Sequence, residues 1–231
     1  MSDAELERIR SEYQARDSAP DTPYRWDNPG YVSYMQGVER VLLGSLSRAN
    51  VALAGRRVLD VGCGTGYFLH RFQEYGAEEC HGIDLMERRI ATGRERYPTL
   101  ELQAGNAAEL PFADGEFDLV TQFTCLSSIL DADVRLSVAR EMQRVSRGWV
   151  LSFDLRGLRL GSIRRGGEAA TPIAPLDEGE LCRLFGAPAL LRRTTLAFEV
   201  ANALGRRELL RQVLAAVPAL RSHLLGLWRK P

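Results

Sequence analysis

The chain has 231 residues, 45% of them hydrophobic, which suits one domain with a sizeable core. Lys and Arg together number 30, as do Asp and Glu, so the net charge is zero. A neutral chain argues against a role driven by electrostatic attraction to nucleic acid or to a membrane surface. Lys230 is the only lysine, so a Schiff-base lysine of the kind that pyridoxal phosphate enzymes need would have to be the penultimate residue.

The cysteines and histidines predict neither a disulfide nor a metal site. Cys63, Cys80, Cys125 and Cys182 form no C-x-x-C pair, and we expect free thiols. The three histidines lack metal-ligand spacing. We find no signal peptide and no apolar run long enough to span a membrane, and we therefore expect a reduced, cytoplasmic protein.

The stretch Val58 to Gly66 organises the chain and reads Val-Leu-Asp-Val-Gly-Cys-Gly-Thr-Gly. A short apolar run ends in three glycines spaced two apart, and Phe68, Leu69 and Phe72 follow at helical spacing. This pattern predicts a strand, a tight turn and a helix. Glycines permit positive φ and let a ligand approach bare backbone, while the N-terminus of the helix offers unpaired N–H groups.

The nature of that ligand follows from the spacing of the glycines. The pattern G-x-G-x-G is one residue shorter than the dinucleotide-binding G-x-G-x-x-G, and no lysine follows it as in a P-loop. The nine-residue segment resembles motif I of the class I S-adenosylmethionine (SAM)-dependent methyltransferases, in which an acidic residue precedes the glycines. The resemblance implies SAM as the cofactor. The cofactor contacts that it implies here are Asp60, Gly62, Cys63, Gly64 and Gly66.

A second acidic residue follows at the distance expected for ribose binding. The stretch Glu79 to Asp84 predicts a strand whose last residue lies 18 positions after Gly66. A carboxylate at this point accepts hydrogen bonds from the two ribose hydroxyls in Rossmann enzymes. The alternative role for Asp84 is that of a helix N-cap. We also assign Leu85, the next residue, to the cofactor site.

The segment Gly105 to Phe112 extends the resemblance and departs from it at one position. Many of these methyltransferases read Gly-Asp-Ala followed by Leu-Pro-Phe, and the Asp side chain holds the adenine amine. Asn106 stands in that position here. Its side-chain carbonyl still accepts a hydrogen bond from an amine, but without charge assistance. The backbone N–H of Ala107 is the expected partner of adenine N1.

The predicted substrate contacts lie at a strand end and in the N-terminal region. Ligands of open α/β sheets bind beyond the C-terminal ends of the strands, and Phe117 to Gln122 predicts a fourth strand. We expect Phe123 to pack on cofactor or substrate and Thr124 to contact substrate, with a turn-forming role as the alternative for Thr124. N-terminal helices of such methyltransferases often close over the cofactor, and plain packing against the sheet is the alternative. The candidate lid aromatics are Tyr24, Trp26 and Tyr31.

One carboxylate is a candidate for the chemistry itself. Trp149 to Leu155 is almost wholly apolar, which predicts a central strand covered on both faces. Asp154, near the end of this strand, is the candidate general base or substrate-orienting group, and a structural role is the alternative. The segment 157–176 is rich in Gly, Pro and Arg. Its length indicates either an active-site loop or a solvated charged loop.

Strands that alternate with helices predict an α/β, Rossmann-like doubly wound sheet. The final stretch, Ser222 to Lys230, fits either a helix or a strand. The resemblance favours a seven-stranded sheet with an antiparallel last strand and the order 3-2-1-4-5-7-6. We expect two regions, a helical cap or lid over 1–50 and a SAM-binding domain over 51–231. Further expected elements are helices at Asp3–Arg16, Tyr31–Arg48 and Arg206–Val217 and a strand at Leu190–Val200.

The resemblance implies a SAM-dependent methyltransferase with a small-molecule acceptor, such as a secondary metabolite or a sugar. Transfer to oxygen is favoured over nitrogen or carbon. We expect no nucleic-acid or membrane partner, and a monomer or homodimer in a bacterial cytoplasm. Two alternatives stay open, a nicotinamide-dependent oxidoreductase and a non-catalytic SAM-binding protein.

Overall fold

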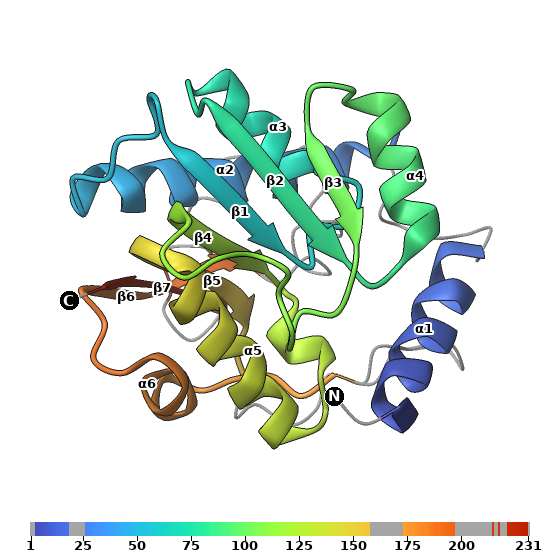
Figure 1. The fold of residues 1–231 in the computed structure, drawn as a ribbon. Coiled ribbons are helices and arrows are strands. Elements are labelled where there is room, and N and C mark those ends of the chain that lie inside the picture. Colours follow the sequence, from blue (N-terminus) through green and yellow to red (C-terminus); the bar gives the residue numbers. More distant parts are fainter. Residues whose placement is uncertain are drawn as a thin grey trace.

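The computed structural model describes residues 3–18, 26–157, 173–196 and 221–230, together with Leu214 and Val217. Seven strands form a single sheet in this part of the chain (Figure 1). Their bounds are β1 (Arg57–Val61), β2 (Glu79–Asp84), β3 (Glu101–Ala104), β4 (Phe117–Phe123), β5 (Ser146–Leu155), β6 (Leu190–Leu196) and β7 (Arg221–Arg229).

The order of the strands confirms the predicted topology. The sheet runs β3-β2-β1-β4-β5-β7-β6. The first five strands in this order are parallel, whereas β7 pairs antiparallel with both β5 and β6. The final stretch of the chain is therefore a strand, as the resemblance favoured. The order reverses between β1 and β4, which is the crevice where such sheets bind ligands.

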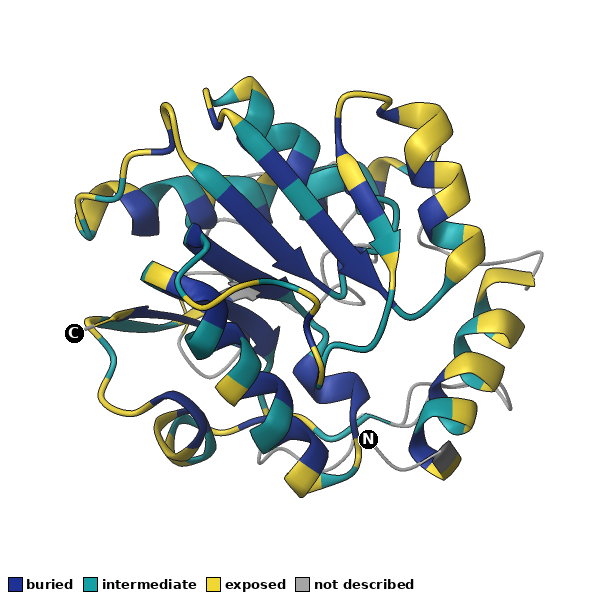
Figure 2. Cartoon of the chain, viewed as in Figure 1, coloured by how far each residue is buried: buried dark blue, intermediate teal, exposed yellow. Residues whose placement is uncertain are grey.

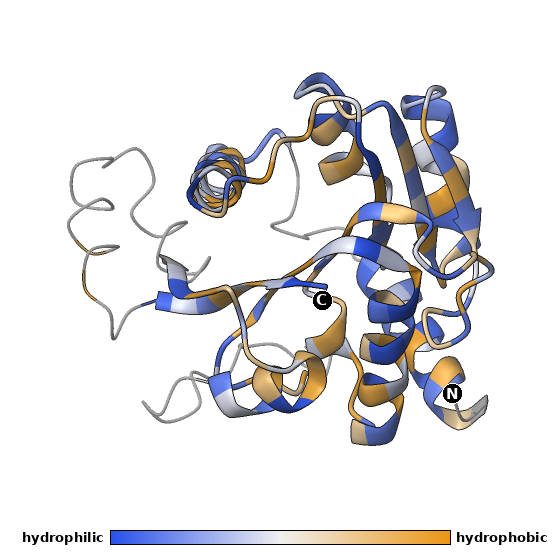
Figure 3. Cartoon of the chain, turned by 60° about the vertical axis from the view of Figure 1, so that its left-hand side comes forward, coloured by the Kyte–Doolittle hydropathy of each residue, from blue (hydrophilic) through white to orange (hydrophobic). Residues whose placement is uncertain are grey.

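Helices cover both faces of the sheet (Figure 1). Apolar residues of α2, α3 and α4 share one buried cluster, and those of α5 and α6 share the other. Central strands are buried along most of their length (Figure 2), and hydrophobic residues alternate with hydrophilic ones along the flanking helices (Figure 3). The helices are α1 (Asp3–Ser18), α2 (Pro29–Arg48), α3 (Tyr67–Glu74), α4 (Glu87–Arg96), the 3₁₀ turn η1 (Leu126–Ser128), α5 (Ala132–Val145) and α6 (Glu178–Phe185).

Several predicted boundaries shift by a few residues, and part of the prediction lies outside the described residues. The fifth strand begins at Ser146 rather than Trp149, because Ser146 already pairs with Phe117 ahead of a bulge in β4. Strand β6 is described to Leu196. Of the expected helix Arg206–Val217, only Leu214 and Val217 are described. None of the helices in the described ranges has the length and apolar character needed to cross a bilayer.

Candidate functional site

The glycine loop between β1 and α3 has the backbone conformation that its sequence predicts. Gly62, Gly64 and Gly66 have φ values of 73°, 58° and 84°, all in the left-handed region that favours glycine. A Cβ atom on Gly62 would lie 2.7 Å from the Cys125 sulfur, whereas a Cβ on Gly64 would meet nothing within 4 Å. The loop is therefore closely packed on one side at Gly62, whereas the space around Gly64 is open.

Asp84, the last residue of β2, holds this loop in place. One carboxylate oxygen accepts from the Gly64 N–H (2.8 Å) and the other from the Met86 N–H (2.9 Å). The side chain is buried, and this burial raises the pKa of Asp84 above its usual value. Each oxygen keeps a further lone pair, so the carboxylate can still accept hydrogen bonds from a ligand.

A cavity lies beyond the C-terminal ends of β1, β2 and β4. The cavity with its mouth encloses about 750 Å³. Six residues predicted from the sequence line it, and the helix α1 contributes Ile9, Tyr13 and Arg16 from the other side. Those six residues are Gly62, Asp84, Leu85, Ala107, Phe123 and Thr124.

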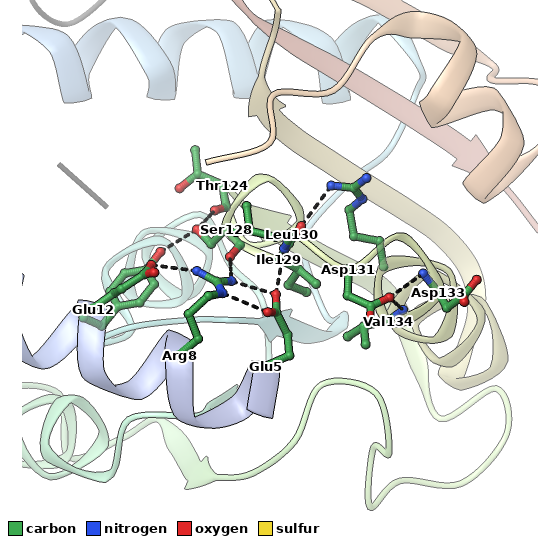
Figure 4. A network of polar contacts seen from close by, with 12 residues as sticks. Glu5, Arg8, Glu12, Thr124, Ser128, Ile129, Leu130, Asp131, Asp133 and Val134 are labelled. Carbon is green, nitrogen blue, oxygen red and sulfur yellow. Dashed lines mark hydrogen bonds and ion pairs between the residues drawn. The ribbon is translucent and has the colours of Figure 1, made fainter. Parts of the chain in front are cut away.

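Helix α1 is fastened over the cavity by polar contacts (Figure 4). Glu5 accepts from the Leu130 N–H (2.7 Å) and pairs with Arg8, which also donates to the Ser128 carbonyl (2.8 Å). The Tyr13 hydroxyl lies 2.6 Å from the Ser128 Oγ. These contacts tie α1 to the turn that follows β4, so α1 forms one side of the cavity.

The family of the chain follows from comparison with known proteins. Residues 58–148 match the family model described as a methyltransferase domain. Over 111 residues the chain is 37% identical to a demethylmenaquinone methyltransferase of Beutenbergia cavernae, which covers 48% of this chain and 45% of that protein. The chain thus spans less than half the length of this curated relative.

Solved structures share the fold. A SAM-dependent methyltransferase from Mesorhizobium loti superposes with a TM-score of 0.58 at 19% identity, over 77% of this chain and 92% of that one. A phosphoethanolamine N-methyltransferase of Haemonchus contortus was solved with phosphoethanolamine and S-adenosylhomocysteine. It superposes with a TM-score of 0.69 at 16% identity, over 99% of this chain and 50% of that one.

Residues 58–148 thus match a methyltransferase domain, and the structure around them has the fold of SAM-dependent methyltransferases. The family match favours SAM over a nicotinamide cofactor, which was the alternative for the glycine pattern. The match also accounts for the fold, because the structure has the strand order that the resemblance implied.

Asn106 uses its side chain locally in the methyltransferase domain. Its Oδ1 accepts from the Ala108 N–H at 3.0 Å, which forms a short turn of the kind that Asn favours. Its neighbours Gly105 and Ala107 line the cavity. A contact from Asn106 to adenine stays a prediction, and it would have to use the second lone pair of this oxygen.

Asp60, in β1, is buried within the methyltransferase sheet. Its Oδ1 accepts from the Thr121 Oγ1 at 2.8 Å. Burial raises the pKa of Asp60 to about 8, the Thr121 hydrogen bond opposes this shift, and the charge of Asp84 adds to it. The role of Asp60 toward the cofactor stays a prediction.

The raised pKa of Asp60 predicts a pH dependence of stability. The native state binds a proton at Asp60 up to about pH 8, whereas the unfolded chain loses it near 3.8. The stabilising contribution is therefore complete at low pH and is lost as the pH rises through the folded pKa. Relative to Asp60→Asn, the wild-type free energy of unfolding should fall by up to about 1.4 kcal/mol per pH unit in this window.

Urea unfolding of both proteins across this pH range measures that slope. Asp118→Asn is the matched control, because its Arg147 hydrogen bond lowers the pKa of Asp118 to about 2, below the window. A stability difference between wild type and Asp60→Asn that does not vary with pH would show that Asp60 is ionised in the native protein.

Asp154 lies deeper than a general base is expected to lie. Its carboxylate is fully buried and accepts from Gln122 Nε2 (3.1 Å), the Ser127 N–H (3.2 Å) and the Leu155 N–H (2.8 Å). Burial raises the pKa of Asp154 to about 6, and these hydrogen bonds oppose the shift. The general-base role stays a prediction, and the contacts favour a structural role in holding the turn after β4.

The predicted lid aromatics lie beside the glycine loop. The Trp26 ring centroid is 4.6 Å from that of Tyr67, the first residue of α3, and 5.2 Å from that of Tyr31. Tyr24 lies outside the described residues, as does 158–172 of the predicted active-site loop. The substrate role of these residues stays a prediction.

The sequence analysis expected a helical cap or lid over 1–50 but did not identify the residues of α1 that line the cavity. Ile9, Tyr13 and Arg16 line the cavity together with Met86 and Arg89. Arg89 also pairs with Asp17 of α1, and its guanidinium carbon lies 4.5 Å from the centroid of the Tyr13 ring. Tyr13 and Arg16 were the residues that could have marked this charged helix as part of a binding site. Nothing in the sequence indicated that these side chains would line the cavity.

Removal of the Glu5 carboxylate should loosen α1 without unfolding the domain. Glu5→Ala leaves the Leu130 N–H and Arg8 without this acceptor, which costs about 1–3 kcal/mol locally. We expect faster hydrogen exchange over residues 3–18 and unchanged exchange in the central strands. Glu7→Ala, at an exposed position of the same helix, is the control. Equal exchange rates in the two variants would contradict the fastening role of Glu5.

Proposed function

We propose that the chain transfers the methyl group of SAM to a hydroxyl oxygen of a small-molecule acceptor. The observation that carries the proposal is the open glycine loop next to a carboxylate that still has free lone pairs, at the edge of a family-matched sheet. The net charge of zero favours a small acceptor over a nucleic acid.

The residues at the cavity fit the chemical groups of SAM. The space at Gly64 admits a ligand against the backbone, and Asp84 offers acceptors to two ribose hydroxyls. Leu85 and Met86 lie beside it with apolar side chains suited to a purine ring, and the Ala107 backbone lines the same cavity. Bound SAM supplies a methyl group on a sulfonium, which is already activated for transfer.

The task of the protein is then to hold the acceptor, exclude water and receive a proton. Proximity and orientation can supply roughly 7–11 kcal/mol of the barrier in favourable cases, so a strong base is not required in every such site. Phe123 and Thr124, at the end of β4, line the cavity and are the proposed contacts near the reacting atoms. Helix α1 is proposed to exclude water from the cofactor.

A second candidate is transfer to carbon. The Beutenbergia cavernae relative is named a demethylmenaquinone methyltransferase, and a hydroxylated ring activates its neighbouring carbon as well as its oxygen.

The acceptor is proposed to be a secondary metabolite or sugar in a bacterial cytoplasm, with the protein acting as a monomer or homodimer.

Methyl-labelled SAM and a panel of phenols, hydroquinones and glycosides test the proposal. We expect label in at least one acceptor, with the product mass and fragmentation assigning oxygen or carbon. Binding of SAM without transfer to any class would favour the non-catalytic alternative.

A further inference from the structure

A tyrosine, a histidine and a serine form a hydrogen-bonded chain outside the cofactor cavity. His223, at the start of β7, is only 3% exposed. Its Nε2 lies 3.1 Å from the Tyr34 hydroxyl of α2, and its Nδ1 lies 2.9 Å from the Ser222 Oγ. Each ring nitrogen is thus hydrogen-bonded to a hydroxyl group, and these two hydrogen bonds fix the orientation of the imidazole.

This chain of side chains lies at the edge of the sheet that carries the site. His223 is the register partner of Leu155, the last residue of β5. The His223 ring stacks on Phe153 with centroids 4.7 Å apart and planes at 10°. Phe153 is in turn the register partner of Phe123, which lines the cavity, and their centroids are 6.1 Å apart. One aromatic ring therefore separates the imidazole from a cavity wall.

Aromatic side chains lie between His223 and the cavity. Phe68, in α3, stacks on Phe123 with centroids 3.7 Å apart and planes at 15°. Phe153, tilted by 43° from Phe123, extends this cluster of rings toward His223, and aromatic surfaces of this kind favour aromatic ligands. A hydroxyl on that ligand needs a polar partner nearby, and Tyr34 offers one.

The charges around His223 favour an anionic acceptor oxygen. Arg221 precedes the Ser222–His223 pair on β7, and Arg156 follows β5 and donates to the Arg221 carbonyl (3.1 Å). On β6, Thr194 pairs with His223. Arg192, two residues earlier, is on the same face, whereas Arg193 is on the other face and forms an ion pair with Glu178. Nearby cations favour the ionised form of a phenol. The nearest carboxylate on a strand is that of Asp154. Its register partner is Leu224, which belongs to the buried cluster on the α5 side, so Asp154 points to the opposite face of the sheet from His223.

We propose that Tyr34 and His223 accept the proton of a phenolic methyl acceptor, a proposal that rests on the proposed methyltransferase function. Tyr34 Oη takes the proton from the acceptor hydroxyl and gives its own proton to His223 Nε2, while Nδ1–H donates to Ser222. The acceptor oxygen forms its bond to the methyl carbon as the carbon–sulfur bond breaks, and that electron pair stays on sulfur. Because His223 is buried, the imidazolium passes its proton back through Tyr34 Oη to solvent after the product leaves. Tyr34 is the catalytic residue, and His223 acts through it.

The ionisation of 4-nitrophenol tests this proposal, because its phenolate absorbs visible light. The full-length protein is titrated with 4-nitrophenol in the presence of S-adenosylhomocysteine, and the pH of half-ionisation is compared with that of the free phenol. We expect the bound phenol to ionise about one pH unit lower in the wild type. Tyr34→Phe and His223→Gln should both abolish the shift while S-adenosylhomocysteine affinity is retained.

A second tyrosine–histidine pair provides the matched control. His70 and Tyr97 stack with ring centroids 4.4 Å apart on α3 and at the end of α4. Tyr97→Phe and His70→Gln should leave the shift unchanged. An unshifted phenol in the wild type, or a shift that survives both Tyr34→Phe and His223→Gln, would overturn this proposal alone. Failure of the wild type to bind S-adenosylhomocysteine would instead overturn the proposed function.

Discussion

Gly62→Ala should destabilise the domain by about 2–5 kcal/mol. The left-handed conformation at this position costs a residue with a side chain about 1–2 kcal/mol. The new methyl group would also lie 2.7 Å and 2.8 Å from Cys125 Sγ and Cβ, and such overpacking typically costs about 1–3 kcal/mol. Urea unfolding measures the loss.

Gly64→Ala separates stability from binding. Its backbone is also left-handed, but the methyl group would meet nothing within 4 Å. We therefore expect a smaller loss of stability than for Gly62→Ala, together with weaker SAM binding, because the methyl group occupies the open space. Equal destabilisation by the two substitutions would contradict the close packing of Gly62 against Cys125.

Asp84→Ala should weaken SAM binding by about 1–3 kcal/mol, which is roughly a 5- to 150-fold rise in Kd. The substitution removes the acceptors proposed for two ribose hydroxyls and also frees the Gly64 and Met86 N–H groups, which position the loop. Titration calorimetry with SAM measures the change.

The control for Asp84→Ala is a carboxylate far from the loop. Asp114 pairs with Arg144, and its side chain is 81% exposed. Asp114→Ala should leave the Kd unchanged, since exposed ion pairs contribute little. An unchanged Kd for Asp84→Ala would refute the ribose assignment and leave Asp84 with its structural contacts alone.

Local patterns in the sequence were sufficient for the parallel strands of the sheet, whereas the last strand and the strand order depended on the resemblance. The apolar run before Gly62 and the stretch up to Asp84 each predicted a strand, and the structure has β1 and β2 there. Parallel strands in sequence order bring their C-terminal ends to one edge. Residues that follow those ends, such as Leu85 and Thr124, therefore meet at the cavity.

Side-chain direction was harder to predict, because it depends on alternation and on local competition. Phe153 and Asp154 are neighbours in β5 and point to opposite faces, so only Phe153 stacks toward His223 on the α2 side. Asn106 offered an acceptor for adenine, but its oxygen bonds the Ala108 N–H two residues away. The residue pattern of a single strand or turn does not show which of several possible partners a side chain will contact.

The position of α1 could not be predicted from its own residues. Half of the residues of the helix are charged. Of its aliphatic residues Ile9 is the one that joins the buried core, and Tyr13 packs against that core. Its placement depends on contacts more than a hundred positions along the chain, from Glu5 to Leu130 and from Arg8 to Ser128. Such long-range polar pairing leaves no periodic signal in the sequence.

Titration calorimetry of the full-length protein with S-adenosylhomocysteine, with NAD and NADP in parallel, tests the central claim most directly. The glycine loop and Asp84 predict binding of S-adenosylhomocysteine that is lost or weakened in Gly64→Ala and Asp84→Ala, and no heat with either nicotinamide. Binding of NAD or NADP, or S-adenosylhomocysteine affinity that neither substitution changes, would contradict the assignment of this cavity to SAM.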